Sequence, residues 1–132
     1  ILDIHESAVK YFFSNAPEDF IPYWDFVFTE KDKQPRDSSA AAIAICGLLE
    51  AFKSMPEDDV RSSLYKDAAD CIMNSLIDNY TSRKYPDAEG LLMHGCYHVR
   101  GNLGVDECMD WGDYFFLEAI MRYLHPEWRK YW

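Results

Sequence analysis

The segment Ala40–Gly47 constrains the fold more than any other part of this chain, because four of its residues are alanine and one is glycine. Alanine is the strongest helix former, and side chains this small let a second helix approach closely. Apolar residues recur through the segment and beyond it at helical spacing, at Ala41, Ile45, Leu48, Leu49 and Phe52. Asp37 or Ser38 is suited to cap the N-terminus. We therefore predict a closely packed helix that ends near Ser54.

Three further segments show the period of amphipathic helices. The first runs from Leu2 to Ala16, and its expected apolar face holds Ile4, Ala8, Tyr11 and Phe12. The second runs to about Tyr80, and its apolar residues repeat every four positions, at Leu64, Ala68, Ile72 and Leu76, with Tyr65, Ala69 and Met73 alongside. The last, from about Gly112 to Leu124, is apolar on nearly all sides, which is typical of a helix covered on two faces. Four long helices predict an all-α fold in a single domain over residues 1–132.

Long connections rich in aromatic residues separate these helices. Residues 20–28 contain Pro22 and favour an extended segment that leads into a loop. Residues 91–99 are apolar with two histidines and are expected to form another short extended segment, followed by a glycine-rich loop. The aromatic and basic tail from Trp128 to Trp132 is expected to pack back onto the body. Loops this elaborate are typical of a chain that carries function on them.

The charge balance excludes one class of partner. Lys and Arg total 13 against 23 Asp and Glu, for a formal net charge of -10. Such a chain repels polyanions on average, so nucleic-acid binding is not expected, although single Arg or Lys side chains can still hold an anionic sugar. No apolar run approaches the roughly 20 residues that span a bilayer, so no membrane partner is expected.

Four widely spaced cysteines, Cys46, Cys71, Cys96 and Cys108, form no C-x-x-C pair. The sequence therefore predicts neither a metal site nor a redox cofactor. Cys46 and Cys71 fall within helical patterns where small apolar residues belong, which favours buried, reduced thiols in a cytoplasmic protein. The chain begins with Ile1 rather than Met, so we expect it to have been part of something longer.

Two segments are candidates for ligand binding. Tyr23-Trp24-Asp25-Phe26 gathers aromatic rings around one carboxylate, which suits a sugar platform but equally suits core aromatics with a loop-fixing Asp. His94–Arg100 is the segment richest in groups that can bind a ligand. Histidine donates or accepts hydrogen bonds near neutral pH, and arginine can hold a carboxylate or sulfate. A substrate-facing loop and structural packing both remain open there. Metal binding is not expected, because Gly95 disfavours the helix that would align the two histidines.

Two helix starts are interpreted mainly as caps. In Arg36-Asp37-Ser38-Ser39, Asp and Ser can accept from free backbone N–H groups while Arg36 pairs with a nearby carboxylate. The alternative is that this helix start faces a sugar pocket. Asp110 and Asp113 flank Trp111 at the start of the last helix, where carboxylates favour the helix dipole. We interpret these two carboxylates as caps rather than as a catalytic acid and base.

Five blocks, in this order, resemble the C-terminal part of the unsaturated glucuronyl hydrolases, glycoside hydrolase family 88. They are Tyr23-Trp24-Asp25, Arg36–Ala44, Leu91–Gly95, Gly104–Glu107 and Trp111–Ala119. The blocks at Arg36 and Trp111 are the specific ones. The resemblance implies a partial (α/α)6 barrel, or toroid, in which this chain supplies roughly the last two or three of six helix pairs. The missing N-terminal part of the barrel is then an expected partner.

The resemblance also implies an activity and a substrate. Family members hydrate the 4,5 double bond of an unsaturated uronic acid at the non-reducing end of oligosaccharides released by polysaccharide lyases. Their two catalytic aspartates lie in the N-terminal half of the barrel, so no catalytic residue is assigned here and the chain alone is expected to be inactive. The loop from His94 to Arg100 corresponds to a region that contacts the downstream sugar. The expected substrate-binding residues are Tyr97, His94, His98, Arg100, Trp24 and Trp111.

The same loop departs from one family pattern. Some members place a serine-and-lysine pattern there that binds a sulfate, whereas this chain has Gly95, His98 and Arg100. The positive charge of Arg100 remains, but a sulfate preference does not follow. Two other functions stay open, namely a non-catalytic carbohydrate-binding module and a helical protein that self-associates through exposed helix faces.

Overall fold

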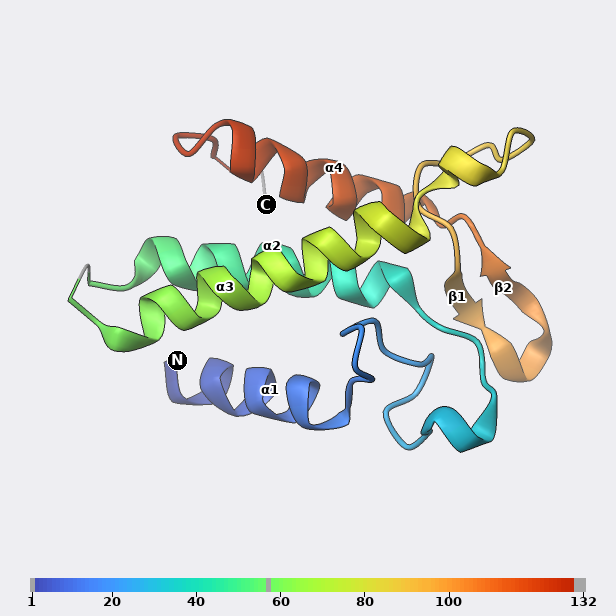
Figure 1. Ribbon diagram of the computed structural model, residues 1–132, viewed down its shortest axis with the longest axis horizontal. Coiled ribbons are helices and arrows are strands. Elements are labelled where there is room, and N and C mark those ends of the chain that lie inside the picture. The colour runs from blue at the N-terminus through green and yellow to red at the C-terminus, as the bar shows by residue number, and fades with distance from the viewer. Residues whose placement is uncertain (1, 57, 130–132) are drawn as a thin grey trace.

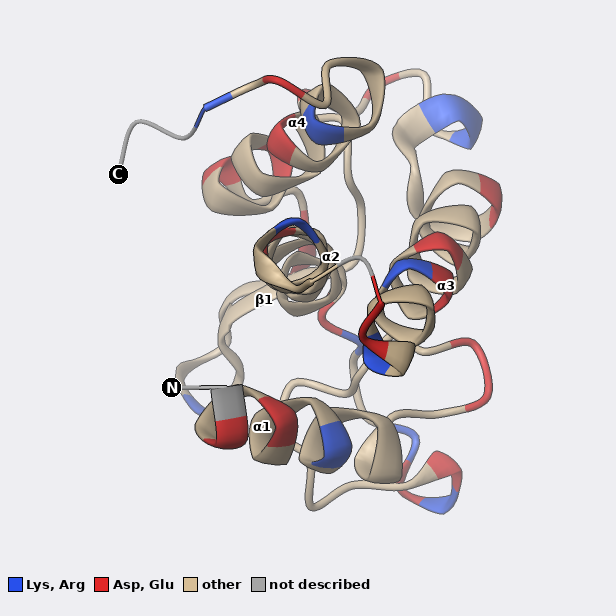
Figure 2. Cartoon of the chain, turned by 90° about the vertical axis from the view of Figure 1, so that its left-hand side faces the viewer, with Lys and Arg blue, Asp and Glu red and all other residues tan. Residues whose placement is uncertain are grey.

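The computed structural model describes residues 2–56 and 58–129. Its long helices are α1 (Leu2–Asn15), α2 (Ser38–Ser54), α3 (Val60–Ser75) and α4 (Asp110–Leu124). In Figure 1, α2 and α4 run in one direction and α1 and α3 in the other. Figure 2 looks along the helices and shows α2 in the centre, with α4, α3 and α1 around it. This is the expected all-α architecture of alternating helices.

Helix α2 is central because its surface is small and apolar almost all round. Ala41, Ala42 and Ile45 are fully buried, and the helix packs against both α3 and α4. The side chain of Asp37 accepts a hydrogen bond from the Ser39 N–H at 3.1 Å, so Asp37 is the N-cap. The predicted end at Ser54 is confirmed.

Helix α3 begins after Asp59, whose side chain accepts from the Arg61 N–H at 2.9 Å. It continues directly into a π-helical turn, Leu76–Tyr80, so the predicted run to Tyr80 is confirmed. The predicted apolar stripe is wrong at Leu64, which is exposed. The residues predicted alongside that stripe, Tyr65, Ala69 and Met73, are confirmed as buried together with Ile72.

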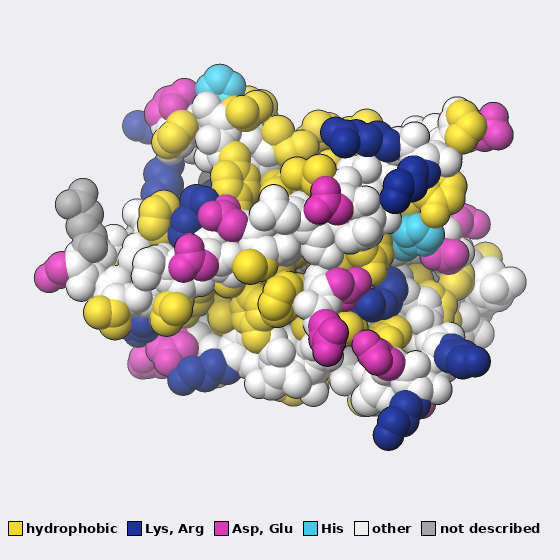
Figure 3. Space-filling model, viewed as in Figure 1, with side chains coloured by type: hydrophobic (Ala, Val, Ile, Leu, Met, Phe, Trp, Pro, Cys, Tyr) yellow, Lys and Arg dark blue, Asp and Glu magenta, His cyan; other side chains and the backbone are white. Residues whose placement is uncertain are grey.

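Helix α1 lies against α2 and α3 on a face that the sequence pattern predicted correctly at Phe12 but wrongly at Ile4 and Tyr11. Ile4 and Tyr11 point outward, whereas Val9, Phe12 and Phe13 pack against the core. The pattern failed because both faces carry apolar residues, and only contact with the other helices decides between them. Narrow apolar grooves of about 240 and 210 Å³ remain where α1 meets α2 and α3. Figure 3 shows hydrophobic side chains open to solvent between α1 and α3.

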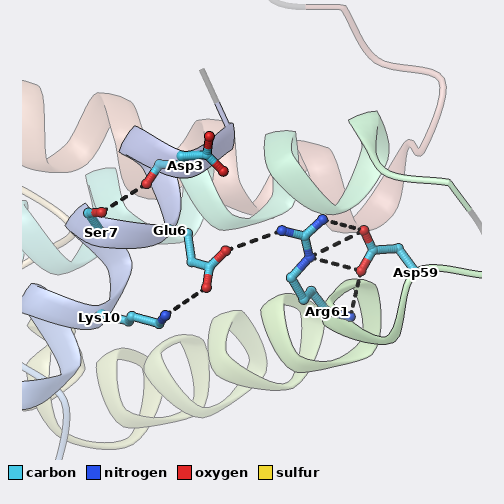
Figure 4. A network of polar contacts seen from close by, with 6 residues as sticks. All are labelled: Asp3, Glu6, Ser7, Lys10, Asp59 and Arg61. Atoms are coloured by element: carbon cyan, nitrogen blue, oxygen red, sulfur yellow. Dashed lines mark hydrogen bonds and ion pairs between the residues drawn. The ribbon is translucent and has the colours of Figure 1, made fainter.

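Ion pairs at the surface help to hold α1 in place. Glu6 accepts from Lys10 at 2.7 Å and from Arg61 at 3.2 Å, and Arg61 also pairs with Asp59 at 2.6 Å, as Figure 4 shows. These groups are open to solvent, which screens their attraction, so each pair is expected to contribute little to stability. The network therefore orients α1 more than it stabilises the fold.

A small antiparallel hairpin covers the end of the helices where α2 and α4 begin (Figure 1). It consists of β1 (Gly95–His98) and β2 (Leu103–Glu107), with Cys96 opposite Val105 and His98 opposite Leu103. The extended segment predicted within residues 91–99 is confirmed as β1. Strand β2 was not predicted, because its glycine and acidic residues lack an apolar alternation.

The chain ends against the body as far as it is described. The Arg122 guanidinium lies 5.3 Å from the centroid of the Trp128 ring, and Lys53 donates to the Trp128 carbonyl at 3.3 Å. Residues 130–132 of the predicted packed tail lie outside the described residues. Within residues 2–56 and 58–129, no helix combines the length and apolarity needed to cross a bilayer.

Two phenols, one buried and one half-buried, predict that the fold weakens at high pH. Tyr80 donates to Asp19 at 2.7 Å and Tyr123 donates to Asp70 at 2.6 Å. Burial is the larger cause and the hydrogen-bonded carboxylate the smaller one, and together they raise the pKa of each phenol above the ordinary tyrosine value. A raised folded pKa means that this stabilisation is complete below about pH 10 and is lost as pH rises through the folded pKa. We expect the urea midpoint to fall above about pH 10. Tyr123→Phe should flatten that fall, whereas Tyr11→Phe, at an exposed phenol, should leave it unchanged.

The cysteines differ in exposure, and this predicts their reactivity. The Cys46 thiol is buried and donates to the Phe115 carbonyl at 3.3 Å, and burial raises its pKa to about 12. Cys71 was expected to be buried, but it is exposed because α3 turns Ile72 and Met73 inward instead. Because the thiolate is the reactive form, iodoacetamide should label Cys71 in the folded chain and Cys46 only after unfolding. Peptide mass mapping measures this, and equal labelling of both in the folded chain would contradict it.

Candidate functional site

Two loop segments converge on the N-terminal end of α2. On one side, the Asp37 N–H donates to the Pro22 carbonyl at 2.8 Å and the Trp24 N–H donates to the Pro35 carbonyl at 3.1 Å. On the other side, the Ser38 N–H donates to the His94 carbonyl at 3.0 Å. The helix start is thus flanked by the aromatic segment 20–28 and by the strand that enters the hairpin. These are two of the segments that the sequence marked as candidates.

Tyr97 of β1 and Trp111 of α4 form the exposed part of this site. Their ring centroids are 5.8 Å apart and their planes are inclined at 60°. The Tyr97 side chain is 68% exposed and Trp111 is 38% exposed, so both rings are accessible. The Trp111 indole N–H donates to the Ser39 hydroxyl at 3.0 Å. We call this pair of rings the aromatic corner; it offers two apolar faces at an angle, with polar ring atoms at their edges.

His94 is held on both sides of its ring. Nδ1 lies 2.6 Å from the Asp106 carboxylate, and Nε2 lies 3.2 Å from the Tyr85 hydroxyl. The geometry assigns the proton to Nδ1, so Nε2 accepts from Tyr85. Both His94 and Asp106 have positive φ, at 65° and 63°, a backbone form that is rare outside glycine. His94 therefore fastens the hairpin to the neighbouring loop, and neither of its nitrogens is left over for a ligand.

Of the other predicted site residues, His98 lies beside the aromatic corner, with its ring centroid 6.5 Å from that of Tyr97. The Trp24 indole donates to the Gln34 side chain at 2.9 Å and its ring packs on Phe28, within its own loop. The His98 ring lies over Gly101, at a distance that a Cβ on Gly101 would not allow. Arg100 is exposed in the hairpin turn, where it can meet an anion.

The Asp113 carboxylate at the start of α4 holds the backbone that leads into the hairpin. Both oxygens of Asp113 accept backbone N–H groups, from Leu91 at 2.9 Å and from Leu92 at 2.8 Å. In the part of the chain that the structure describes, no group of three or more His, Cys, Asp and Glu side chains is arranged to hold a metal ion. Sequence reasoning treated Asp113 as a helix cap. Its bonds to a strand about twenty positions earlier become visible only once α4 is docked.

Sequence reasoning also missed three residues that build the site. Ser39 was interpreted mainly as a capping residue, with a helix start facing a sugar pocket as the alternative, and its hydroxyl contact with Trp111 across α2 and α4 was not foreseen. Tyr85 was not selected, and Asp106 was selected only within the block Gly104–Glu107 and without a role, although both fix His94. The local signal for Asp106 was a carboxylate in a glycine-containing loop close to two histidines. A pairing across an unpredicted hairpin cannot be derived from that signal.

Comparison with known proteins places this arrangement in context. No family model matches the chain. It is 39% identical over 130 residues to an unsaturated chondroitin disaccharide hydrolase of Streptococcus pneumoniae. This match covers 98% of this chain and 33% of that protein. It is 42% identical to the crystal structure of an unsaturated glucuronyl hydrolase from Streptococcus agalactiae, with a TM-score of 0.87 over 94% of this chain and 33% of that one.

A variant of the Streptococcus agalactiae enzyme has also been solved in complex with dGlcA-GalNAc6S, and this chain matches it at 43% identity with a TM-score of 0.85. That match covers 92% of this chain and 32% of the other. The chain spans about a third of the length of the curated relatives it matches. The chain is therefore homologous, over nearly all of its length, to one segment of the α/α-barrel unsaturated glucuronyl hydrolases.

Proposed function

We propose that this chain is the C-terminal segment of an unsaturated glucuronyl hydrolase of glycoside hydrolase family 88. The whole enzyme, here called the parent, would hydrate the 4,5 double bond of an unsaturated uronic acid at the non-reducing end of lyase-generated oligosaccharides. The observation that carries the proposal is the match over 94% of the chain at a TM-score of 0.87 and 42% identity. We place the parent in the cytoplasm, in keeping with the free cysteines.

Within the parent, this segment would bind sugar rather than carry out the chemistry. The aromatic corner would hold the sugar that follows the unsaturated uronate, with Tyr97 and Trp111 against its C–H face. Arg100, in the hairpin turn, would supply the positive charge for an anionic group on that sugar. His94 and His98 would shape the hairpin, and Trp24 would line the opposite side of the helix start. The catalytic aspartates would come from the part of the barrel that precedes this segment.

The experiment compares the parent with the isolated chain on an unsaturated disaccharide, following the loss of the ultraviolet absorbance of its double bond. The parent should turn the substrate over and the chain alone should not. Turnover by neither protein would overturn the proposed activity. Turnover by the isolated chain would instead show that its own carboxylates are sufficient and that no upstream aspartates are needed.

A carbohydrate-binding module without activity is the second candidate, and the exposure of the aromatic corner favours it. Both rings are accessible in the chain as it stands. Calorimetric titration of the isolated chain with an unsaturated disaccharide distinguishes the two candidates. Binding at millimolar concentration or below that is lost in Tyr97→Ala would support the module. A flat titration beside an active parent would leave the enzyme segment as the function.

We also expect the isolated chain to self-associate, because one side of α4 is apolar and uncovered. Exposed residues follow each other along this helix at helical spacing: Trp111, Tyr114, Leu117, Met121 and Leu124. In the parent, the missing part of the barrel would cover Tyr114, Leu117, Met121 and Leu124 and leave Trp111 open to the sugar. Light scattering after size exclusion should give a dimer or larger species for the isolated chain. Leu117→Lys should shift it towards monomer, whereas Val27→Lys, at an exposed loop position, should not. A monomer at all concentrations would contradict the expectation.

A further inference from the structure

We propose that Ser39 is a positioning residue for substrate binding, whose hydroxyl fixes the indole of Trp111 so that this ring and Tyr97 keep the angle of the aromatic corner. The inference rests on the proposed function and adds to it a residue that does not itself touch the sugar. It follows from a chain of hydrogen bonds that runs from α2 to α4.

Each hydrogen bond in this chain has a fixed direction. The Ser39 hydroxyl donates its only hydrogen to Asp37 Oδ1 at 2.6 Å. Its lone pairs are then left to accept the indole N–H of Trp111, at 3.0 Å. Ser39 is buried, so water does not compete readily for either bond. A carboxylate at one end thus determines how the hydroxyl points, and the hydroxyl determines how the indole lies.

The backbone of Trp111 is already held by the contact between the helices. A Cβ added to the next residue, Gly112, would lie 3.2 Å from the Ser39 Cβ, so α4 presses against α2 at this point. With the backbone fixed, rotation of the indole about its side-chain bonds is the freedom that remains. The hydrogen bond to Ser39 removes it, and the ring then stays 5.8 Å from Tyr97 at 60°.

The cap of α2 does not require this hydroxyl. Capping needs the Asp37 carboxylate and the backbone N–H of Ser39, which are 3.1 Å apart and which alanine at position 39 would retain. A buried residue next to Gly112 must be small, but it need not be polar. The Ser39 hydroxyl is therefore needed to hold the indole of Trp111 rather than to cap α2.

The test is steady-state kinetics of the parent on an unsaturated disaccharide. Ser39→Ala and Trp111→Phe, which removes the indole N–H but keeps a ring, should each raise KM by about 3- to 10-fold with kcat retained, since binding is lost equally in ground and transition states. The double variant should be no worse than either single one. Asp37→Asn keeps an acceptor for the hydroxyl and should retain a near-normal KM.

Ser38→Ala is the matched control, because Ser38 is an adjacent buried serine that donates to the Met93 carbonyl instead. Ser38→Ala should lower Tm about as much as Ser39→Ala does. It should not raise KM in the way that Ser39→Ala and Trp111→Phe both do. In the isolated chain, the Trp111 indole N–H should exchange slowly with solvent, and Ser39→Ala but not Ser38→Ala should accelerate that exchange.

The outcomes distinguish the positioning role of Ser39 from the proposed function of the parent. An active parent in which Ser39→Ala keeps its KM, or in which the two losses add, would overturn the positioning role and leave the proposed function intact. If Ser39→Ala does not fold, Trp111→Phe alone decides, because its ring is partly exposed and an unchanged KM would overturn the role. A parent without turnover would overturn the proposed function, and the positioning role with it.

Discussion

Replacing Arg122 by Leu is expected to lower the free energy of unfolding by about 3–5 kcal/mol, because it removes one partner of a buried ion pair. The Arg122 side chain is only 7% exposed, and its guanidinium donates to Glu118 at 2.9 Å and to Glu50 at 2.8 Å. Glu118 is 2% exposed on the same helix, whereas Glu50 lies on α2. Without the arginine, the Glu118 carboxylate must stay charged in an apolar interior or take up a proton. Urea unfolding followed by circular dichroism at fixed concentration measures the loss.

Arg61 is the matched control, since it also joins two acidic side chains but is 37% exposed. Arg61→Leu should cost much less, because solvent screens the attraction between exposed charges. The double variant Glu118→Leu with Arg122→Leu should recover most of the lost stability, because it leaves no buried charge at position 118. If Arg122→Leu costs no more than Arg61→Leu, the buried pair contributes little and the apolar contacts of α2 and α4 hold these helices together unaided.

The helices could be predicted from the sequence because their signals are local. Asp37 and Asp59 cap the helices that they precede, and proline follows close to the predicted ends. Which face a helix buries could be predicted only where the two faces differ clearly, as in α2, where Ala41, Ile45, Leu48 and Leu49 are buried as predicted and only Phe52, near the end of the helix, is wrong because it is exposed. In α1 and α3 apolar residues lie on both faces, and the choice depends on neighbours that the local pattern does not contain. Ile4 and Leu64 were misplaced for this reason.

The candidate site could be predicted in its parts but not in its connections. Tyr97 and Trp111 were both selected from the sequence, but nothing local indicated that their rings would meet. His94 was selected for its chemistry, and the structure gives both nitrogens to Tyr85 and Asp106. Arg36 was expected to pair with a nearby carboxylate, and that expectation is confirmed, although its partner, Asp19, lies 17 positions away. Contacts between distant segments depend on how the helices dock, which spacing along the chain does not encode.

Asp19 is the second position at which one substitution should cost much of the stability. Its carboxylate accepts two hydrogen bonds from Arg36, at 2.9 and 3.0 Å, and a third from the Tyr80 hydroxyl at 2.7 Å. These bonds join the end of α1, the start of α2 and the end of the π-helical turn. Asp19→Ala leaves a half-buried guanidinium and a buried phenol without this acceptor, so we expect a loss of about 2–4 kcal/mol. Thermal and urea unfolding should both report it.

Two variants show whether that loss comes from the acceptor itself. Asp19→Asn keeps one oxygen to accept from Arg36 or Tyr80 and should lose about half as much as Asp19→Ala. Asp25→Ala is the matched control, because Asp25 is a loop carboxylate that accepts one backbone N–H, from Val27 at 3.1 Å, and it should cost about 1 kcal/mol or less. Equal losses in Asp19→Ala and Asp25→Ala would contradict the prediction. The arginine would then be held chiefly by the Ile21 carbonyl and by the Tyr23 ring, whose centroid lies 4.7 Å from its guanidinium.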